Sequence, residues 1–245
     1  MRDARRLLSG AAGLLGGAVG GVAGGVAGGA ADLVDLAIPR TCGGCGAPGV
    51  RWCGRCEAAL HDVPARIRTT VTVGAPVWTL GRYDGPRSAA VVRLKERGRG
   101  DLAVPLGRAL AHALLRLRAW HEIADPVIVV PAPTTVWSAR RRGGDVVTAV
   151  CRAAADVAAP VCPVTVAPLL RSVGAAESVG LGASARAANV RGTVRVRRGA
   201  QHVAASGTVV LVDDVITTGA TLAESVAALR RCGIAVSAAL TIAAA

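Results

Sequence analysis

The sequence predicts an α/β fold in which a parallel sheet is flanked by helices, with a small four-cysteine knuckle before it. Three observations support this fold class. Short apolar runs of β-forming residues alternate with longer helical patterns, as they do in βαβ units. One of these runs, at residues 209–212, ends in Asp213 and Asp214 and leads into a turn rich in hydroxyl groups. Two Cys-x-x-Cys pairs precede all of these elements in the chain.

The composition bounds the size of the protein and the class of its ligands. A chain of 245 residues accommodates one sizeable α/β domain and a small appendage. Its 29 basic and 16 acidic residues give a net charge of +13, which favours a polyanionic partner such as nucleic acid, or an anionic substrate. Only one basic residue, Lys95, is a lysine. Its compact ammonium can approach a phosphate as a point charge, so Lys95 is a candidate phosphate ligand, with a surface role as the alternative.

Residues 1–31 form a Gly/Ala-rich, low-complexity extension without a charged residue from Leu7 to Ala31. Three interpretations stay open: a poorly ordered extension, a helix that associates with a membrane through residues 7–31, and an export signal. We favour the first, because glycine weakens helices and Ala and Val drive membrane insertion only weakly. Deleting residues 2–30 should therefore leave ligand binding intact.

Residues 32–63 are expected to form a zinc knuckle. Its candidate ligands are Cys42, Cys45, Cys53 and Cys56. Each pair spans a turn small enough for two thiolates to meet one ion, and four thiolates close a tetrahedral structural Zn²⁺ site. Two disulfides are the alternative, but so short a segment has almost no core without a metal. Trp52, between Arg51 and Arg55, either stacks on the bases of a single strand or packs the knuckle against the main domain.

Residues 64–245 are predicted to form the sheet domain. In its first half we predict a linker at 64–68, strands at 71–73 and 77–83, helices at 88–97 and 102–120, a strand at 127–130 and a helix at 145–159. Ser88 is a preferred N-cap residue. The helix at 102–120 has apolar residues every three or four positions, and the apolar run before Pro131 suits a buried parallel strand.

The second half of the domain completes the alternation of strands and helices. Here we predict a strand or loop at 164–171, strands at 193–196 and 209–212, a helix at 220–232 and a strand at 235–242. Ligands of open α/β sheets bind beyond the carboxyl ends of the strands. Asp213 and Asp214 lie at that edge.

The turn after residues 209–212 has the chemistry of a sugar-phosphate site. Adjacent carboxylates can accept hydrogen bonds from two neighbouring ribose hydroxyls, and the N-terminus of the next helix can bind a phosphate. The phosphate loop would consist of Thr217, Thr218, Gly219, Ala220 and Thr221. A capped turn with solvated acids is the alternative.

Residues 209–222 resemble the diphosphate-ribose signature of type I phosphoribosyltransferases, whose substrate is 5-phosphoribosyl 1-diphosphate (PRPP). Five features precede it in order: the four-cysteine knuckle, Leu94-Lys95, a Val-Pro-Ala-Pro turn, Arg142-Gly143 and Arg186-x-x-Asn189. Over about residues 32–245 this order resembles the ComF family of competence-associated phosphoribosyltransferase-like proteins. The resemblance implies a type I phosphoribosyltransferase fold with a zinc knuckle, a cytoplasmic protein, and in some bacteria a role in the uptake of single-stranded DNA.

The resemblance also implies a role for each motif. Asp213 and Asp214 match the ribose-binding acids, and residues 217–221 match the 5′-phosphate loop. The residues on the diphosphate side would be Pro131, Ala132, Pro133, Thr134, Thr135, Lys95 and Arg142. Mg²⁺ would bridge diphosphate and ribose oxygens. Any reaction would displace diphosphate from the anomeric carbon, but no residue is an obvious catalytic base.

The nucleobase-facing hood departs from the family pattern. Many relatives carry a Phe after the diphosphate loop and a Gln before the Arg-x-x-Asn element, and both are missing here. This puts recognition of a base in doubt, although Arg186 and Asn189 remain hood candidates. A non-catalytic adaptor that binds single-stranded nucleic acid and a helicase-like competence protein is the alternative function. Assembly into a homo-oligomer is left open.

Overall fold

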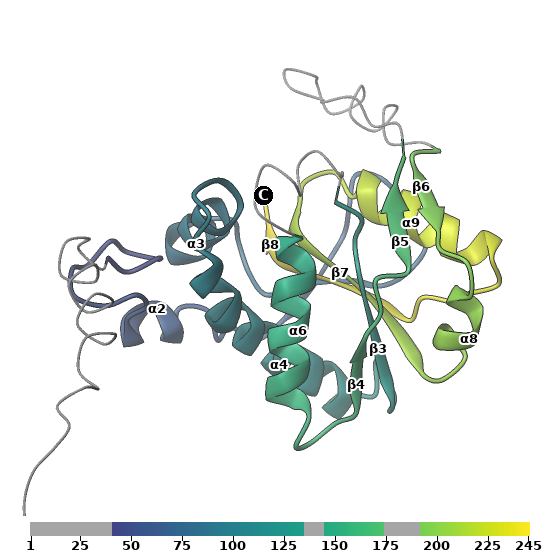
Figure 1. Cartoon of the computed structure of the whole chain (residues 1–245), viewed down its shortest axis with the longest axis horizontal. Helices are drawn as coiled ribbons and strands as arrows, with labels where there is room; N and C mark the ends of the chain where they lie inside the picture. Colours follow the sequence, from purple (N-terminus) through teal and green to yellow (C-terminus); the bar gives the residue numbers. More distant parts are fainter. Residues whose placement is uncertain (1–40, 135–144, 174–191) are drawn as a thin grey trace, which may run out of the picture. The chain divides into compact units, whose positions relative to one another are not determined.

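A computed structural model describes residues 41–134, 145–173 and 192–245 (Figure 1). The chain divides into two compact units, Met1–Pro39 and Arg40–Ala245, and the description concerns the second. Among the described residues, none of the helices has the length and apolar character needed to cross a bilayer. The predicted membrane-associating segment, residues 7–31, lies outside the described residues.

The centre of the fold is a six-stranded sheet with the strand order β1-β2-β8-β7-β3-β4. In that order the strands are Ala65–Ile67, Val77–Thr79, Ala238–Ala244, Thr208–Ile216, Val127–Pro131 and Val164–Val166. All neighbouring strands are parallel except β1 and β2, which are antiparallel. The predicted α/β class with a mostly parallel sheet is confirmed. The central strand, β7, carries Asp213 and Asp214 near its carboxyl end.

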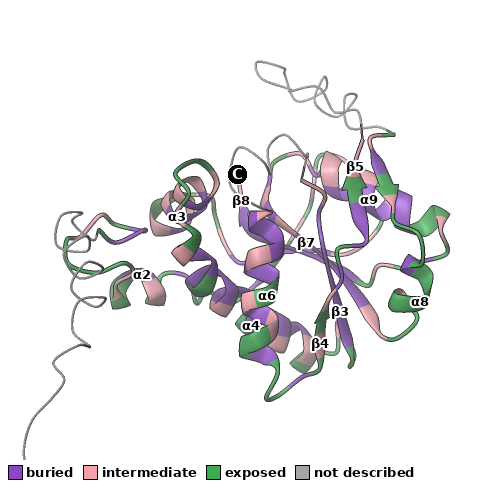
Figure 2. Ribbon diagram, viewed as in Figure 1, coloured by how far each residue is buried: buried purple, intermediate pink, exposed green. Residues whose placement is uncertain are grey.

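Helices cover both faces of this sheet. They are α3 (Gly85–Glu96), the short η1 (Gly100–Leu102), α4 (Ala103–Ala119), α6 (Val146–Ala158), α8 (Ala200–Ala204) and α9 (Ala220–Arg231). Val210 and Val212 pack into the cluster formed with α3, α4 and α6, whereas Val209 and Leu211 pack into the cluster on the side of α9. Central strands are therefore buried on both faces, as Figure 2 shows, and this explains their unbroken apolar runs.

Two further elements complete the described chain. A hairpin of β5 (Leu170–Ser172) and β6 (Val194–Val196) forms a separate antiparallel sheet, which lies beside α9 (Figure 1). The knuckle contains one short helix, α2 (Gly54–Ala58). Leu60, at the end of the knuckle, is buried in the same core cluster as Trp78 and Leu80 of the sheet domain.

The structure differs from the predicted elements in several places. Helix α8 was not predicted, and the strand predicted at 77–83 ends at Thr79. The first strand, β1, occupies the predicted linker, and residues 71–73 form no strand. Helix α3 begins at Gly85 rather than Ser88, because Pro86 suits the first turn of a helix and Asp84 occupies the N-cap position. Strand β7 continues through both aspartates to Ile216, since it keeps pairing with β8 beyond them.

Candidate functional site

The acidic pair of β7 is joined to helix α3 by an ion pair. The Lys95 ammonium lies 2.7 Å from Oδ2 of Asp214, and the Lys95 and Asp214 side chains are 26% and 13% exposed. The backbone N–H of Val215 donates to Oδ1 of the same carboxylate at 2.6 Å. Two predicted site residues that lie far apart in the sequence are thus in direct contact. A partly desolvated pair of this kind is screened less by salt than a surface pair.

Asp213 lies in a different environment from its neighbour. Its Oδ1 accepts a hydrogen bond of 2.8 Å from the backbone N–H of Asp214. Burial and the nearby Asp214 carboxylate together raise the pKa of Asp213 to about 7. The ammonium of Lys95 opposes this shift but does not cancel it. At neutral pH, Asp213 is therefore poised to lose a proton when a cation or a hydrogen-bond donor approaches.

The predicted phosphate loop, residues 217–221, connects β7 to α9 and is held by the segment before β2. Gly219 has φ of 88° and is the N-cap of α9. A Cβ at Gly219 would lie 3.1 Å from Cβ of Thr69 and 3.3 Å from Val73, so a larger side chain would push against this segment. The carbonyl of Thr218 accepts a hydrogen bond of 2.9 Å from Val71 N–H. Both the backbone conformation and the close packing therefore require glycine here.

The predicted diphosphate-side turn follows β3 and is tied to the strand of the acidic pair. Ala132, two residues before Thr134, donates its N–H to the carbonyl of Val212 at 2.7 Å. The Thr134 hydroxyl donates to Oδ1 of Asp145 at 3.1 Å, and Asp145 caps α6 by accepting from the N–H of Thr148. Asp145 was not predicted as a site residue, and its proximity to Thr134 was not evident from the sequence. Four predicted residues lie outside the described ones: Thr135, Arg142, Arg186 and Asn189.

A groove that the sequence did not predict lies beside the phosphate loop. It encloses about 830 Å³. Its walls are formed by Arg66, Ile67, Arg68, Thr69, Thr72, Val73, Gly74, Ala75, Pro76 and Val77. Two of these residues, Thr69 and Val73, are also the ones that a Cβ at Gly219 would meet, so the groove borders the phosphate loop. The only sequence signal is the run of Arg and Thr residues before Gly74.

The four cysteines of the knuckle form a compact cluster. The Sγ atoms of Cys42, Cys45, Cys53 and Cys56 all lie within 4.8 Å of one another. Those of Cys45 and Cys53 are 3.7 Å apart. Zn–S bonds of about 2.3 Å place the sulfurs of a tetrahedral site about 3.8 Å apart, so the cluster fits a structural Zn²⁺. All described cysteines are free thiols, which does not agree with the disulfide alternative.

The electrostatics of the cluster suit a cation. Burial raises the pKa of Cys42, but the N–H groups of Gly44, Cys45 and Cys53 outweigh it and bring the pKa to about 6. The N–H of Ala47 and the Arg55 guanidinium lower the pKa of the Cys45 thiol. Burial raises that of Cys56. These N–H donors favour the thiolate form of Cys42 and Cys45, which is the form that binds a metal ion.

Trp52 does not lie free on the surface of the knuckle. Its side chain is half-buried and packs against the main core cluster. This placement agrees with the interpretation in which Trp52 joins the knuckle to the sheet domain.

No protein-family model matches the chain. The chain is similar to the DNA utilization protein YhgH of Salmonella typhimurium strain LT2, with 30% identity over 199 residues. The matched region covers 79% of each of the two proteins.

Proposed function

The chain belongs to the family of the DNA utilization protein YhgH, the ComF family, and from this membership we propose that it binds PRPP with Mg²⁺ at the carboxyl end of β7. The observation that carries the proposal is the contact of 2.7 Å between Lys95 and Asp214. It brings the single lysine of the chain to the acidic pair, which is where a diphosphate would need a point charge.

In this proposal each part of the site has one task. Asp213 and Asp214 accept hydrogen bonds from the ribose hydroxyls, and residues 217–221 bind the 5′-phosphate at the N-terminus of α9. Lys95, with the turn after β3, faces the diphosphate. Mg²⁺ would use ligand oxygens and water rather than a full set of protein ligands. Because PRPP is an intracellular metabolite, we place the protein in the cytoplasm.

Titration calorimetry with PRPP and Mg²⁺ tests the proposal. Replacing both acids, Asp213→Asn and Asp214→Asn, removes charge-assisted hydrogen bonds that are worth about 1.5–3 kcal/mol each, so the affinity should fall by roughly 10²- to 10⁴-fold. The exposed Asp156 of α6 provides a matched control, and Asp156→Asn should bind as the wild type does. Equal affinity in the double variant and the control would refute the proposal.

Catalysis is a separate question from binding. A phosphoribosyltransferase would release diphosphate from PRPP when an acceptor is supplied, and its protein groups would mainly position the sugar and stabilise the leaving group. A binding module would hold PRPP without releasing diphosphate. Measuring diphosphate release with a panel of nucleobases distinguishes the two functions.

A second candidate function, binding of single-stranded nucleic acid, is favoured by the hairpin of β5 and β6. Arg171 and Arg195 are direct register partners on the two strands, and both are exposed. Arg197 and Arg198 follow and are also exposed. Within the described parts of the chain, none of the four forms an ion pair. Like charges placed directly opposite each other destabilise a sheet, which a bound polyanion would reverse.

Salt-dependent binding of an oligonucleotide tests this surface. Fluorescence anisotropy with a single-stranded oligonucleotide should show weaker binding for Arg171→Ser/Arg195→Ser, and a salt slope reduced by about 0.7 per lost phosphate contact. The control, Arg116→Ser/Arg152→Ser, removes the same charge from exposed positions on α4 and α6. If both double variants lose affinity equally, only the net charge matters and the hairpin is not the binding surface.

A further inference from the structure

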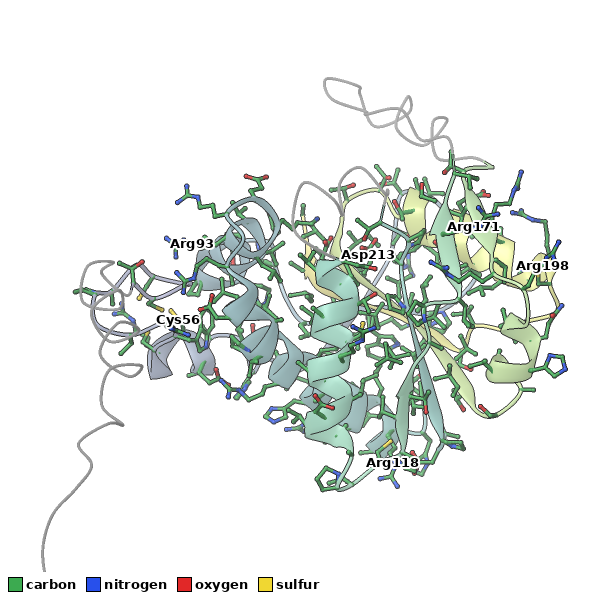
Figure 3. The ribbon with its side chains drawn as sticks, in the orientation of Figure 1. Cys56, Arg93, Arg118, Arg171, Arg198 and Asp213 are labelled. Carbon is green, nitrogen blue, oxygen red and sulfur yellow. The ribbon has the colours of Figure 1, made fainter. Side chains whose placement is uncertain are left out.

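Helix α3 lies between the four-cysteine knuckle and the carboxyl end of β7, and it contacts both. In Figure 3 Arg93 is labelled close to Cys56, and Asp213 is labelled nearer the centre of the sheet domain. Arg93 and Lys95 are two residues apart, and two residues correspond to a rotation of about 200° around a helix with 3.6 residues per turn. Their side chains therefore leave α3 on opposite sides. One reaches the knuckle and the other reaches the acidic pair.

On the knuckle side, Arg93 binds the backbone of the first Cys-x-x-Cys turn. Its Nη1 donates to the carbonyl of Cys42 at 2.8 Å and to that of Gly44 at 3.1 Å. The same turn supplies N–H groups that point at the Cys42 sulfur. Arg93 thus binds the carbonyl of the Gly44–Cys45 peptide unit, whose N–H supports the Cys42 thiolate. If metal binding moves the backbone of this turn, the two hydrogen bonds of the Arg93 guanidinium must change with it.

Two further arginines strengthen the attachment. The buried Arg87, six residues earlier on α3, donates to the carbonyl of Ala59 at 3.1 Å and to Asp62 at 2.8 Å. Arg99, six residues after Arg93, donates to the carbonyl of Thr41 at 3.1 Å. The knuckle is therefore fixed to α3 and to the residues that follow it mainly through backbone carbonyls. Such bonds depend on the path of the knuckle chain, which the metal would determine.

On the other side of α3, the Lys95 ammonium lies 2.7 Å from Asp214. We propose that occupancy of the four-cysteine centre sets the position of Lys95 through Arg93, so that metal binding and binding at the acidic pair are coupled. Arg93 is then a positioning residue. Because coupling is reciprocal, a ligand that tightens the Lys95–Asp214 pair also tightens metal binding. The identity of that ligand as PRPP rests on the proposed function.

The single lysine makes this coupling measurable without PRPP. An amine-reactive acylating reagent modifies Lys95 and the N-terminal amine, and peptide mapping separates the two sites. The Lys95 side chain is 26% exposed and lies against Asp214, so the reagent has little access to its amine and the reaction is slow. Removing zinc with a chelator should raise the labelling rate of Lys95 by about fivefold or more, which is the lower end of typical coupling between linked sites.

The decisive variant keeps the metal but removes the hydrogen bonds between α3 and the first Cys-x-x-Cys turn. Zinc-saturated Arg93→Ala, with its metal content checked by elemental analysis, should label at Lys95 about as fast as zinc-free wild type. Arg97→Ala is the matched control, since Arg97 is exposed just after α3 and its side chain forms no hydrogen bond or ion pair within the described ranges. Wild-type labelling in fully loaded Arg93→Ala would overturn the proposal. This variant also decides the matter if the chelator unfolds the knuckle.

PRPP affinity in the same proteins separates this proposal from the function on which it rests. If wild type binds PRPP, the affinity of Arg93→Ala should be lower than that of Arg97→Ala by a similar factor of about five or more. Equal affinities would overturn the coupling to the ligand site. If wild type binds no PRPP, the proposed function fails, whereas the labelling rates still decide whether the metal centre positions Lys95.

Discussion

The two neighbouring aspartates of β7 differ in their partners, and this difference defines the chemistry of the acidic pair. Asp214 has a cation at 2.7 Å, so its charge is compensated within the protein. Asp213 accepts a hydrogen bond from the backbone N–H of Asp214 but forms no ion pair among the described residues, and its pKa is raised to about 7. A ligand that brings hydroxyl donors or a divalent cation would supply what Asp213 lacks.

The raised pKa of Asp213 predicts a pH-dependent stability. The ordinary value is 3.8 and the folded value is about 7, so between them the folded state holds a proton that the unfolded state has released. The free energy of unfolding should therefore fall as the pH rises from about 4 to about 7, and then level off. Asp213→Asn should remove this fall. Urea unfolding at pH 5 and pH 8 measures it, and an equal pH dependence in variant and wild type would contradict the prediction.

At the scale of elements, the sequence predicted most reliably those segments whose pattern alone determines their structure. The apolar run before Asp213 became the centre of the sheet, and the periodic segment at 102–120 became η1 and α4. The strand β1 could not be predicted, because its residues are mostly exposed and it exists through pairing with β2. Propensity does not report such pairing.

In the site, too, residues that are adjacent in the sequence were predicted, whereas contacts between residues far apart in the sequence were not. The motif around Asp213 and Asp214 was evident because all its residues are adjacent in the sequence. The position of Thr69 and Val73 beside Gly219 was not predicted, because about 150 residues separate them and no local pattern connects the two segments. The hydrogen bonds from Arg93 to the carbonyls of the knuckle were not predicted for a further reason. The sequence is so rich in arginine that no single arginine stands out as a candidate.

The close packing of the turn between β7 and α9 predicts that adding a methyl group at Gly219 destabilises the protein. Gly219→Ala places a Cβ on a left-handed residue and against Thr69, so the free energy of unfolding should fall by about 1–3 kcal/mol. Gly233→Ala is the matched control: its φ is 73°, but the space around it is open, so only the backbone strain remains. Denaturant unfolding should show a larger loss for Gly219→Ala, and only this variant should weaken PRPP binding. A smaller loss than that of Gly233→Ala would contradict the packing described for the loop.

At the scale of the whole described unit, the knuckle and the sheet domain share one core. Leu60 is buried together with Trp78 and Leu80, and Gly43 packs so closely on Leu102 that no side chain fits between them. A metal ion bound by the four cysteines would therefore stabilise more than its own loop. Ordering of the knuckle should contribute to the stability of the residues that follow it.

This shared core predicts the effect of losing the metal. We expect about one Zn²⁺ per chain, measured by elemental analysis of protein purified without chelator. Cys45→Ser should lose the metal and lower the thermal midpoint of the whole unit, followed by circular dichroism. Cys232→Ser, which changes a half-buried thiol outside the cluster, should do neither. An unchanged midpoint in metal-free Cys45→Ser would mean that the knuckle folds independently of the sheet.

The strand order of the sheet also bears on how the protein is made. Strand β2 pairs with β8, and β3 pairs with β7, so both strands pair with segments that are synthesised much later than they are. Until residues 208–244 have emerged, the nascent chain exposes β2 and β3 as open apolar edges, which are prone to aggregate. The knuckle and α3 emerge well before that point. A knuckle that has bound zinc would fix the position of α3 during this interval. The zinc concentration during translation should therefore determine the fraction of chains that reach the folded state.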